Sequence, residues 1–239
     1  DWHAIFLAYI AFSGLTMLWL GLRQPETLPV AARRTLNPAD LIAATRELFR
    51  HRIVLVSTFL QALTLGALFA TLSTIQPIFE IVHGRADSFP LWFAVIAVAS
   101  MSGSLLNSRI VMTLGMRRVV RGTYVALILL TLATLAVLAS GIVTGDAAFV
   151  VQLIWSVGLF ATMGLTMGNL NALAMEPVGY IAGLAASVIS ALATIGSVLL
   201  AIPVGIAFDG TSLPLLAGVA VLIGAALVLA HRTLDERRS

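Results

Sequence analysis

The sequence predicts an all-α membrane protein with seven transmembrane helices, grouped as one helix plus a six-helix half-bundle. The first observation behind this prediction is composition. Of the 239 residues, 59% are hydrophobic and only 10% are charged, whereas soluble domains carry about 25% charged residues. The mean hydropathy is +1.02. A water-soluble core of this length could not enclose so much apolar surface, so lipid is expected to surround most of the chain.

The second observation is the spacing of the charged residues. A membrane-spanning helix needs roughly 20 apolar residues. The sequence contains seven uncharged intervals of about this length or longer: 4–22, 53–79, 88–108, 122–145, 147–175, 177–208 and 210–230. These intervals lack the period-two alternation of membrane β-strands. Because backbone polar groups in lipid must be satisfied within the segment, each interval is predicted to be a helix.

The third observation is the distribution of arginine, which accounts for all 14 basic residues other than histidine. If the chain enters the membrane from outside, thirteen arginines fall in the segments 23–52, 109–121 and 232–239, and Arg85 alone falls on the opposite side. The positive-inside rule therefore predicts an external N-terminus and a cytoplasmic C-terminus. Arginines placed between apolar runs are typical of membrane-flanking charge, and no nucleic-acid partner is predicted.

A polar segment over 24–51 separates the first interval from the other six. It is predicted to be a cytoplasmic connector, followed by a bundle over 52–231 and a cytoplasmic tail over 232–239. Asn37-Pro38 has the form of a helix N-cap with Pro at the first helical position. Apolar residues then recur at helical spacing: Leu41, Ile42, Thr45, Leu48 and Phe49. The segment is predicted to form an amphipathic helix on the membrane surface, with a solvated linker as the alternative.

Two of the predicted helices share a short pattern. Gln61 is followed after six residues by Leu-Phe-Ala-Thr at 68–71, and Gln152 is followed in the same way by Leu-Phe-Ala-Thr at 159–162. The two helices are expected to cross the membrane in opposite directions. The pattern therefore predicts two inverted three-helix repeats, an arrangement found in transporters whose substrate site lies near the bilayer midplane. A chance match of five positions in apolar sequence is the alternative.

The segment after the third interval carries a glycine and arginine motif formed by Gly103, Asn107, Arg109, Gly115, Arg117 and Arg118. It resembles the Gly-x-x-x-Asp/Asn…Arg…Gly-x-Arg-Arg signature of the cytoplasmic hairpin loops in the major facilitator superfamily. Gly103 is expected to let two helices approach closely, and the arginines favour the negative end of a helix dipole. Asn107 stands where the stronger form of the signature has Asp. Ordinary positive-inside topology is the alternative explanation of the arginines.

Segment 171–187 narrows the resemblance. It is similar to the turn and following helix of drug:proton antiporters of the bicyclomycin/chloramphenicol-resistance type, although Tyr180 stands where that pattern usually has His. The opening Asp1-Trp2-His3 and the segment 25–28 are similar to the bounds of that family's sixth helix. The resemblance implies that 1–23 is the last helix of an N-terminal half, that 24–51 is the central loop, and that 52–231 holds helices seven to twelve. Helices one to five would belong to a missing half.

The resemblance also implies a function. The chain would be a fragment of a secondary active multidrug efflux transporter of the bacterial inner membrane. Such a transporter works by proton-coupled antiport with alternating access, and the efflux of drugs confers antibiotic resistance. Its partners would be membrane lipid, a small amphipathic drug-like substrate, protons and the missing N-terminal half. Glu176 would gate the cytoplasmic side by pairing with arginines, with a helix cap as the alternative.

Proton coupling requires a titratable group within the membrane, and none of the seven intervals contains Asp, Glu, Lys, Arg or His. The coupling carboxylate is therefore expected in the missing half, and this chain alone is predicted not to catalyse transport.

Uncommon polar or aromatic residues within the apolar intervals are the candidates for the wall of a substrate cavity. Amides can hydrogen-bond a ligand without a buried charge, and aromatic faces suit bulky or cationic drugs. The candidates are Gln61, Thr64, Phe69, Gln76, Gln152, Trp155, Asn169 and Asn171. For each residue taken alone, contact between helices or core packing is the alternative role.

Missing residue types argue against other functions. The absence of Cys removes disulfides and thiolate metal sites, and the four histidines stand singly, so no metal or other cofactor is predicted. The chain has no Lys for a retinal Schiff base, so a retinal-binding protein is not predicted. It has no paired intramembrane catalytic residues, so an enzyme is not predicted. A non-transporting membrane scaffold and another seven-helix receptor are the alternatives to a transporter.

Overall fold

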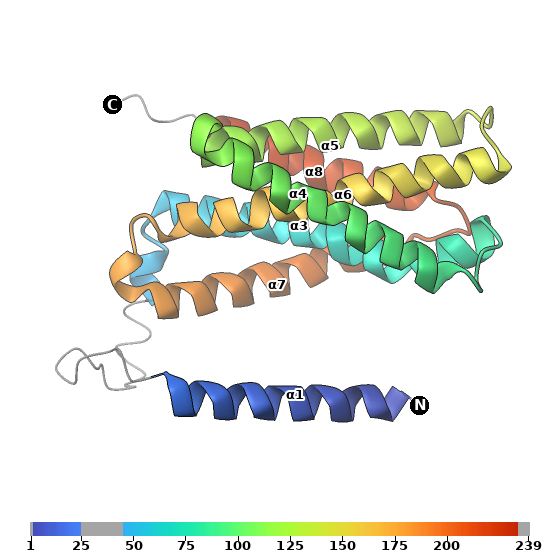
Figure 1. Ribbon diagram of the computed structural model, residues 1–239. Helices are drawn as coiled ribbons and strands as arrows, with labels where there is room; N and C mark the ends of the chain where they lie inside the picture. The colour runs from blue at the N-terminus through green and yellow to red at the C-terminus, as the bar shows by residue number, and fades with distance from the viewer. Residues whose placement is uncertain (1, 25–44, 234–239) are drawn as a thin grey trace. The chain divides into compact units, whose positions relative to one another are not determined.

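The computed structural model describes residues 2–24 and 45–233, and all regular structure in these ranges is helical (Figure 1). Seven helices in the described ranges are long and apolar enough to cross a membrane, as the composition predicted. Contacts within the chain divide it into two units, Asp1–Asp40 and Leu41–Ser239, and each is described by itself. Most of the predicted amphipathic helix falls at 25–44, outside the described residues.

The first unit contains helix α1 (Trp2–Arg23). Large apolar side chains are exposed on all of its faces within this unit; Phe6 is 60% exposed, Met17 78% and Leu22 78%. A helix that is apolar on all faces must be surrounded by lipid or by neighbouring helices. Near its end, the Arg23 guanidinium lies 5.3 Å from the centre of the Trp19 ring, a pairing suited to a membrane interface.

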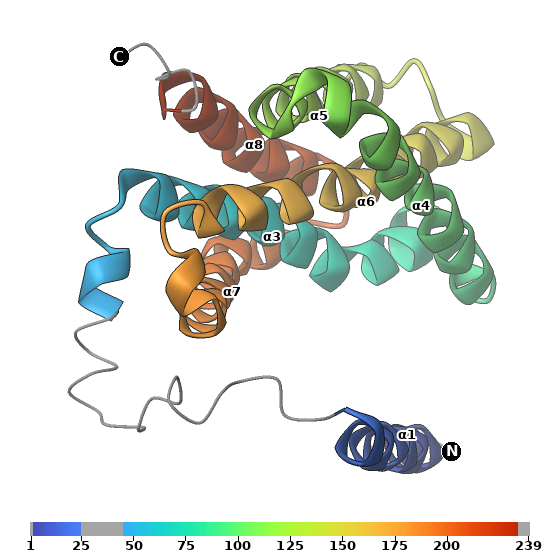
Figure 2. The ribbon, with the colours of Figure 1, turned by 60° about the vertical axis from the view of Figure 1, so that its left-hand side comes forward.

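The second unit is a bundle of six long helices. They are α3 (Arg52–Pro77), α4 (Phe89–Leu114), α5 (Met116–Ala139), α6 (Gly145–Met175), α7 (Ala182–Ile206) and α8 (Leu213–Thr233). A π-helical turn (Ile78–Val82) extends α3, and a 3₁₀ turn (Gly179–Ile181) precedes α7. Helices α3 and α6 contact each other in the middle, α5 and α8 pack against them, α7 packs on α3, and α4 packs on α6 (Figure 2).

The helix contacts repeat in pairs, as two inverted three-helix repeats require. Exchanging α3 with α6, α4 with α7 and α5 with α8 converts the α3–α7 contact into the α6–α4 contact, and the α3–α8 contact into the α6–α5 contact. All four contacts are present and are among the most extensive in the bundle. Because successive helices run in opposite directions, the second triplet is inverted relative to the first. The predicted fold class is confirmed.

Glycine makes the two counterpart crossings close. A Cβ atom added to Gly103 of α4 would lie 2.1 Å from the Ala161 carbonyl oxygen of α6. In the α3–α7 crossing, a Cβ on Gly196 would lie 3.1 Å from the Ala62 Cβ, and a Cβ on Gly66 would lie 3.1 Å from the Leu200 Cβ. Small residues in membrane helices allow backbones to approach because lipid supplies no hydrophobic drive between helices. The expectation for Gly103 is confirmed.

The motif around residues 109–121 is helical rather than a loop, which corrects the predicted helix ends at 108 and 122. Helix α4 continues to Leu114 and α5 begins at Met116, so Gly115 alone joins them. Its φ of +80° lies where a side chain is strained. Long arginine side chains can reach polar surroundings from a helix near the membrane surface, so they do not end the helices. The helix ends carrying Arg52, Arg117 and Arg232 lie at one end of the bundle, opposite the loop with Arg85 (Figure 1).

Candidate functional site

Two buried amides occupy matching positions on the central helices. Gln61 on α3 is 4% exposed and Gln152 on α6 is fully buried. The Nε2 atom of Gln61 and both polar atoms of Gln152 have no hydrogen-bond partner among the described residues, and the hydroxyl of Ser57, one turn before Gln61, has none either. An unsatisfied buried polar group costs about 1–3 kcal/mol. Three such side chains on the two helices related by the repeat therefore call for a functional explanation.

Two other candidates hold the core together. The Thr64 hydroxyl lies 2.7 Å from the Tyr124 hydroxyl of α5, and the Trp155 indole nitrogen donates to the Thr131 hydroxyl of α5 at 3.0 Å. Thr64 and Trp155 are both completely buried. Each therefore ties a central helix to α5.

The remaining cavity candidates are scattered. Phe69 is half-buried against the core, and Gln76 and Asn171 are exposed near opposite ends of the bundle. Asn169 donates from its Nδ2 atom to the Asn107 side-chain oxygen of α4 at 2.8 Å, beside the Gly103 crossing. The eight candidates do not form one wall in the described residues. Gln61 and Gln152 are the two that remain buried with polar atoms unpaired.

The residues of the glycine and arginine motif have separate structural roles. Gly103 makes the α4–α6 crossing, and Gly115 forms the α4–α5 turn. Arg117 donates to Glu176 at 3.3 Å, which links the start of α5 to the end of α6. Arg109 is exposed, and no acidic partner is recorded for Arg109 or Arg118 among residues 45–233. Glu176 thus has a partner within the described residues.

The turn between α6 and α7 carries the end of the connector. Leu48 is 1% exposed and packs with Val178, Ile181 and Ala185. The Tyr180 hydroxyl donates to the Glu47 carboxylate. Gly179, Gly183 and Ser187 recur at every fourth residue, a spacing typical of a close-packing stripe for a partner helix. All three are exposed, and a Cβ on either glycine would meet nothing within 4 Å among the described residues. The stripe therefore contacts no helix of this unit.

The sequence of the chain also matches a known protein family. Residues 1–201 match the model of the Major Facilitator Superfamily. The chain belongs to the major facilitator superfamily. Family membership explains the two inverted triplets, and the chain is a multi-pass membrane protein of this transporter family. The prediction of the superfamily from the motif at 103–118 is confirmed.

One curated relative of the superfamily is similar over most of this chain. It is the "Uncharacterized MFS-type transporter YdgK" of Bacillus subtilis (strain 168), which is 25% identical over 193 residues. The match covers 80% of this chain and 46% of the relative, so the chain spans less than half the length of this superfamily member. No solved structure matches the chain. The described residues contain no cluster of His, Asp and Glu suited to a metal ion.

Sequence reasoning missed two residues near the central amides. Ser57 does not stand out in the sequence because serine is common in apolar runs. The feature that could have identified it is its position four residues before Gln61, on the same face of the helix. Tyr124, which contacts Thr64, is the one tyrosine of helix α5. A buried tyrosine usually has a hydrogen-bond partner, and this rule could have identified it.

A polar and aromatic cluster lies at the opposite end from the arginine-rich helix ends. His83 packs edge-on against Phe149, with ring centres 5.3 Å apart. Arg85 lies 4.3 Å from the centre of the same Phe149 ring and pairs with Asp146 at 2.7 Å. Burial, and secondarily the positive charge of Arg85, hold the pKa of His83 below its ordinary value of 6.5.

The lowered pKa of His83 predicts a loss of stability in acid. The unfolded chain takes up a proton at His83 more readily than the folded chain, so protonation favours unfolding. The stability contribution is present above pH 6.5 and is lost as the pH falls from there through the folded pKa. The melting temperature of His83→Phe should therefore fall less between pH 7.5 and pH 5 than that of the unaltered protein. Equal falls in the two proteins would contradict this prediction.

Proposed function

We propose that this chain is the C-terminal half of a proton-coupled efflux transporter for small amphipathic, drug-like molecules. In this proposal the cytoplasmic side of the bacterial inner membrane faces the arginine-rich helix ends, and an N-terminal half completes the transporter. The match to this chain covers less than half of the superfamily relative, which supports the proposal that a second half completes the transporter. The resemblance of segment 171–187 to drug:proton antiporters supports the substrate class.

The observation that carries the proposal is the pair of unsatisfied amides on α3 and α6. A buried amide without a partner is costly in the ligand-free state. The cost is recovered when a substrate supplies the missing hydrogen bonds, which makes the amide a binding group rather than a packing group. Gln61 is nine residues from the start of α3 and Gln152 is seven residues from the start of α6, and these two central helices run in opposite directions. The two amides therefore lie on opposite sides of the middle of the bundle, and each would bind the substrate at a different depth along its path.

Aromatic side chains supply the apolar surface that a drug-like molecule needs. Phe69 and Phe160 occupy matching positions in the two repeats and are partly buried at the edge of the core. Within the described helices of the second unit, charged side chains occur only near the helix ends. The proton-coupling carboxylate is accordingly proposed to lie in the N-terminal half.

The test uses the full-length transporter in proteoliposomes with an imposed pH gradient and a fluorescent lipophilic cation as substrate. Gradient-driven movement of the cation is expected, and it should stop when the gradient is collapsed. Gln152→Leu should lower the transport rate at least tenfold, equivalent to about 1.4 kcal/mol. The same change should leave the melting temperature equal or higher, because it removes an unsatisfied buried group of similar size. Gln61→Leu should behave in the same way.

The split between transport and stability makes the test decisive. A Gln152→Leu transporter with unaltered transport would exclude the proposed binding role. Loss of stability in step with transport would assign Gln152 to packing. Transport of the cation without a pH gradient would exclude proton coupling, and transport by residues 1–239 alone would exclude the need for a second half.

A further inference from the structure

A groove lies on the outside of the bundle, between α4, α5 and α6, away from the central amides. Its volume is about 360 Å³. Helices α4 and α5 are joined only by Gly115 and contact each other much less than each contacts α6. Leu106, Leu114 and Gly122 line the groove and are exposed, so it opens to the surroundings of the bundle rather than to its interior.

Small residues create the groove. On α5, Gly122 and Ala126 line it, and a Cβ added to Gly122 would meet nothing within 4 Å. On α6, Gly158 and Ala161 line it. In a protein interior such a gap would be filled, because interiors are close-packed. On a membrane-facing surface the gap is available to a hydrocarbon chain.

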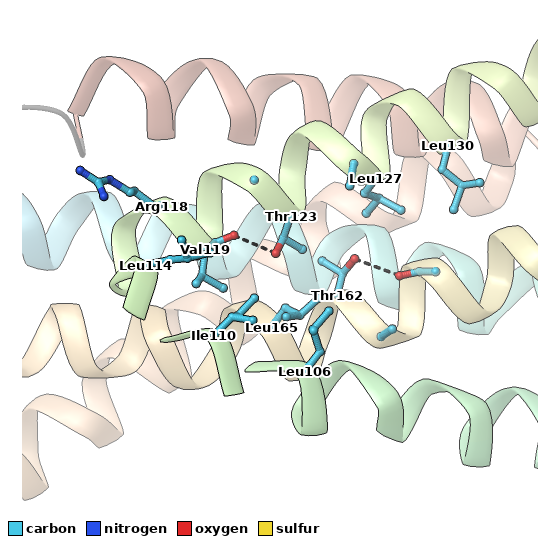
Figure 3. A pocket seen from close by; sticks show the side chains of 14 residues that line it. Leu106, Ile110, Leu114, Arg118, Val119, Thr123, Leu127, Leu130, Thr162 and Leu165 are labelled. Atoms are coloured by element: carbon cyan, nitrogen blue, oxygen red, sulfur yellow. Dashed lines mark hydrogen bonds between the residues drawn. The ribbon is translucent and has the colours of Figure 1, made fainter. Parts of the chain in front are cut away.

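Between its two ends the groove offers a ligand no free hydrogen-bond donor. The two hydroxyls in the lining already donate to their own helices, Thr123 to the Val119 carbonyl at 2.8 Å and Thr162 to the Gly158 carbonyl at 3.0 Å (Figure 3). The rest of the lining between the two ends is aliphatic. A polar ligand would lose most of its hydrogen bonds to water in these mainly aliphatic surroundings, so the groove suits an alkyl chain.

The two ends of the groove differ. Figure 3 shows Arg118 at one end and Leu130 at the other. Leu130 is twelve residues beyond Arg118 on α5, which corresponds to about 18 Å of helix, close to half of the roughly 30 Å hydrocarbon core of a bilayer. Arg117 next to it pairs with Glu176, whereas no acidic partner is recorded for Arg118 among the described residues. The groove therefore has the length of one lipid leaflet and a cation at its membrane-surface end.

We propose that this groove binds an anionic phospholipid, with one acyl chain between α4 and α5 and the phosphate at Arg118. The charge of the guanidinium selects an anionic headgroup, and the missing side chain of Gly122 makes room for the acyl chain. Basic residues at the membrane surface attract anionic lipids. The site is separate from the proposed transport pathway and does not depend on the substrate class.

The test is native mass spectrometry of the full chain released from detergent, with phosphatidylglycerol and phosphatidylcholine of identical acyl chains as probes. The unaltered protein should bind phosphatidylglycerol about fivefold more tightly, the effect expected for one arginine at the membrane surface. Arg118→Gln should lower the affinity for phosphatidylglycerol to that for phosphatidylcholine. Gly122→Leu should weaken binding of both lipids, because leucine fills the groove.

The matched control is Arg232→Gln, which removes an arginine at the same end of the bundle that does not line the groove. It should leave the lipid preference unaltered. Melting temperatures without added lipid verify that the variants fold, and Gly122→Leu is expected to melt no lower because its new side chain enters open space. Full phosphatidylglycerol affinity in Arg118→Gln, or an equal loss in Arg232→Gln, would overturn the proposal. So would full affinity for both lipids in Gly122→Leu.

Discussion

Gly103→Ala is expected to detach α4 from α6 and to lower the stability of the bundle by about 1–3 kcal/mol or more. The added Cβ would lie 2.1 Å from the Ala161 carbonyl oxygen and 2.9 Å from its Cα. These are backbone atoms, which cannot move aside as the end of a flexible side chain can. Separation of the helices would also weaken the Asn169–Asn107 hydrogen bond, now 2.8 Å long. The measurement is the thermal unfolding temperature in detergent.

Gly224→Ala on α8 is the matched control for Gly103→Ala. A Cβ there would meet nothing within 4 Å, and alanine stabilises a helix interior by roughly 1 kcal/mol relative to glycine. The control should therefore melt at an equal or higher temperature. If the melting temperature of Gly103→Ala equalled that of Gly224→Ala instead of lying well below it, the close contact between α4 and α6 would be disproved.

Trp155→Ala is expected to cost about 3–5 kcal/mol, the range found when a large buried aromatic side chain is removed. Trp155 is fully buried in the main core cluster, and its indole nitrogen donates to Thr131 at 3.0 Å. Trp155→Phe retains most of the apolar volume and loses this hydrogen bond, so its cost should be smaller. Chemical unfolding of the two variants measures both losses.

The same pair of variants decides whether Trp155 belongs to the transport pathway. If the residue only supports the core, the transport rate per folded molecule should stay unaltered in Trp155→Phe. A raised KM in Trp155→Phe with unaltered stability would show instead that the ring contacts the substrate. Such a result would return Trp155 to the cavity wall and contradict its placement as a tie between α5 and α6.

The candidate site shows where sequence reasoning reaches its limit. Polar residues in apolar helices could be found by type alone, and all eight candidates were named in this way. Their roles depend on which way each helix face is turned, and this is decided by packing against other helices. Gln152 and Trp155 are three residues apart on α6, yet Trp155 is bonded to Thr131 of α5 whereas the Gln152 amide has no partner in the described residues.

The sequence by itself determined that lipid surrounds this protein, how many helices span the membrane, and to which superfamily the chain belongs. These depend on local properties, since about 20 uncharged residues in lipid must form a helix whatever their neighbours are. Only the tertiary structure decided that 109–121 is helical on both sides of Gly115, that Gly103 meets Ala161, and that Arg117 pairs with Glu176. These features depend on the distance and rotation between helices, which are set by close packing of side chains far apart in the chain.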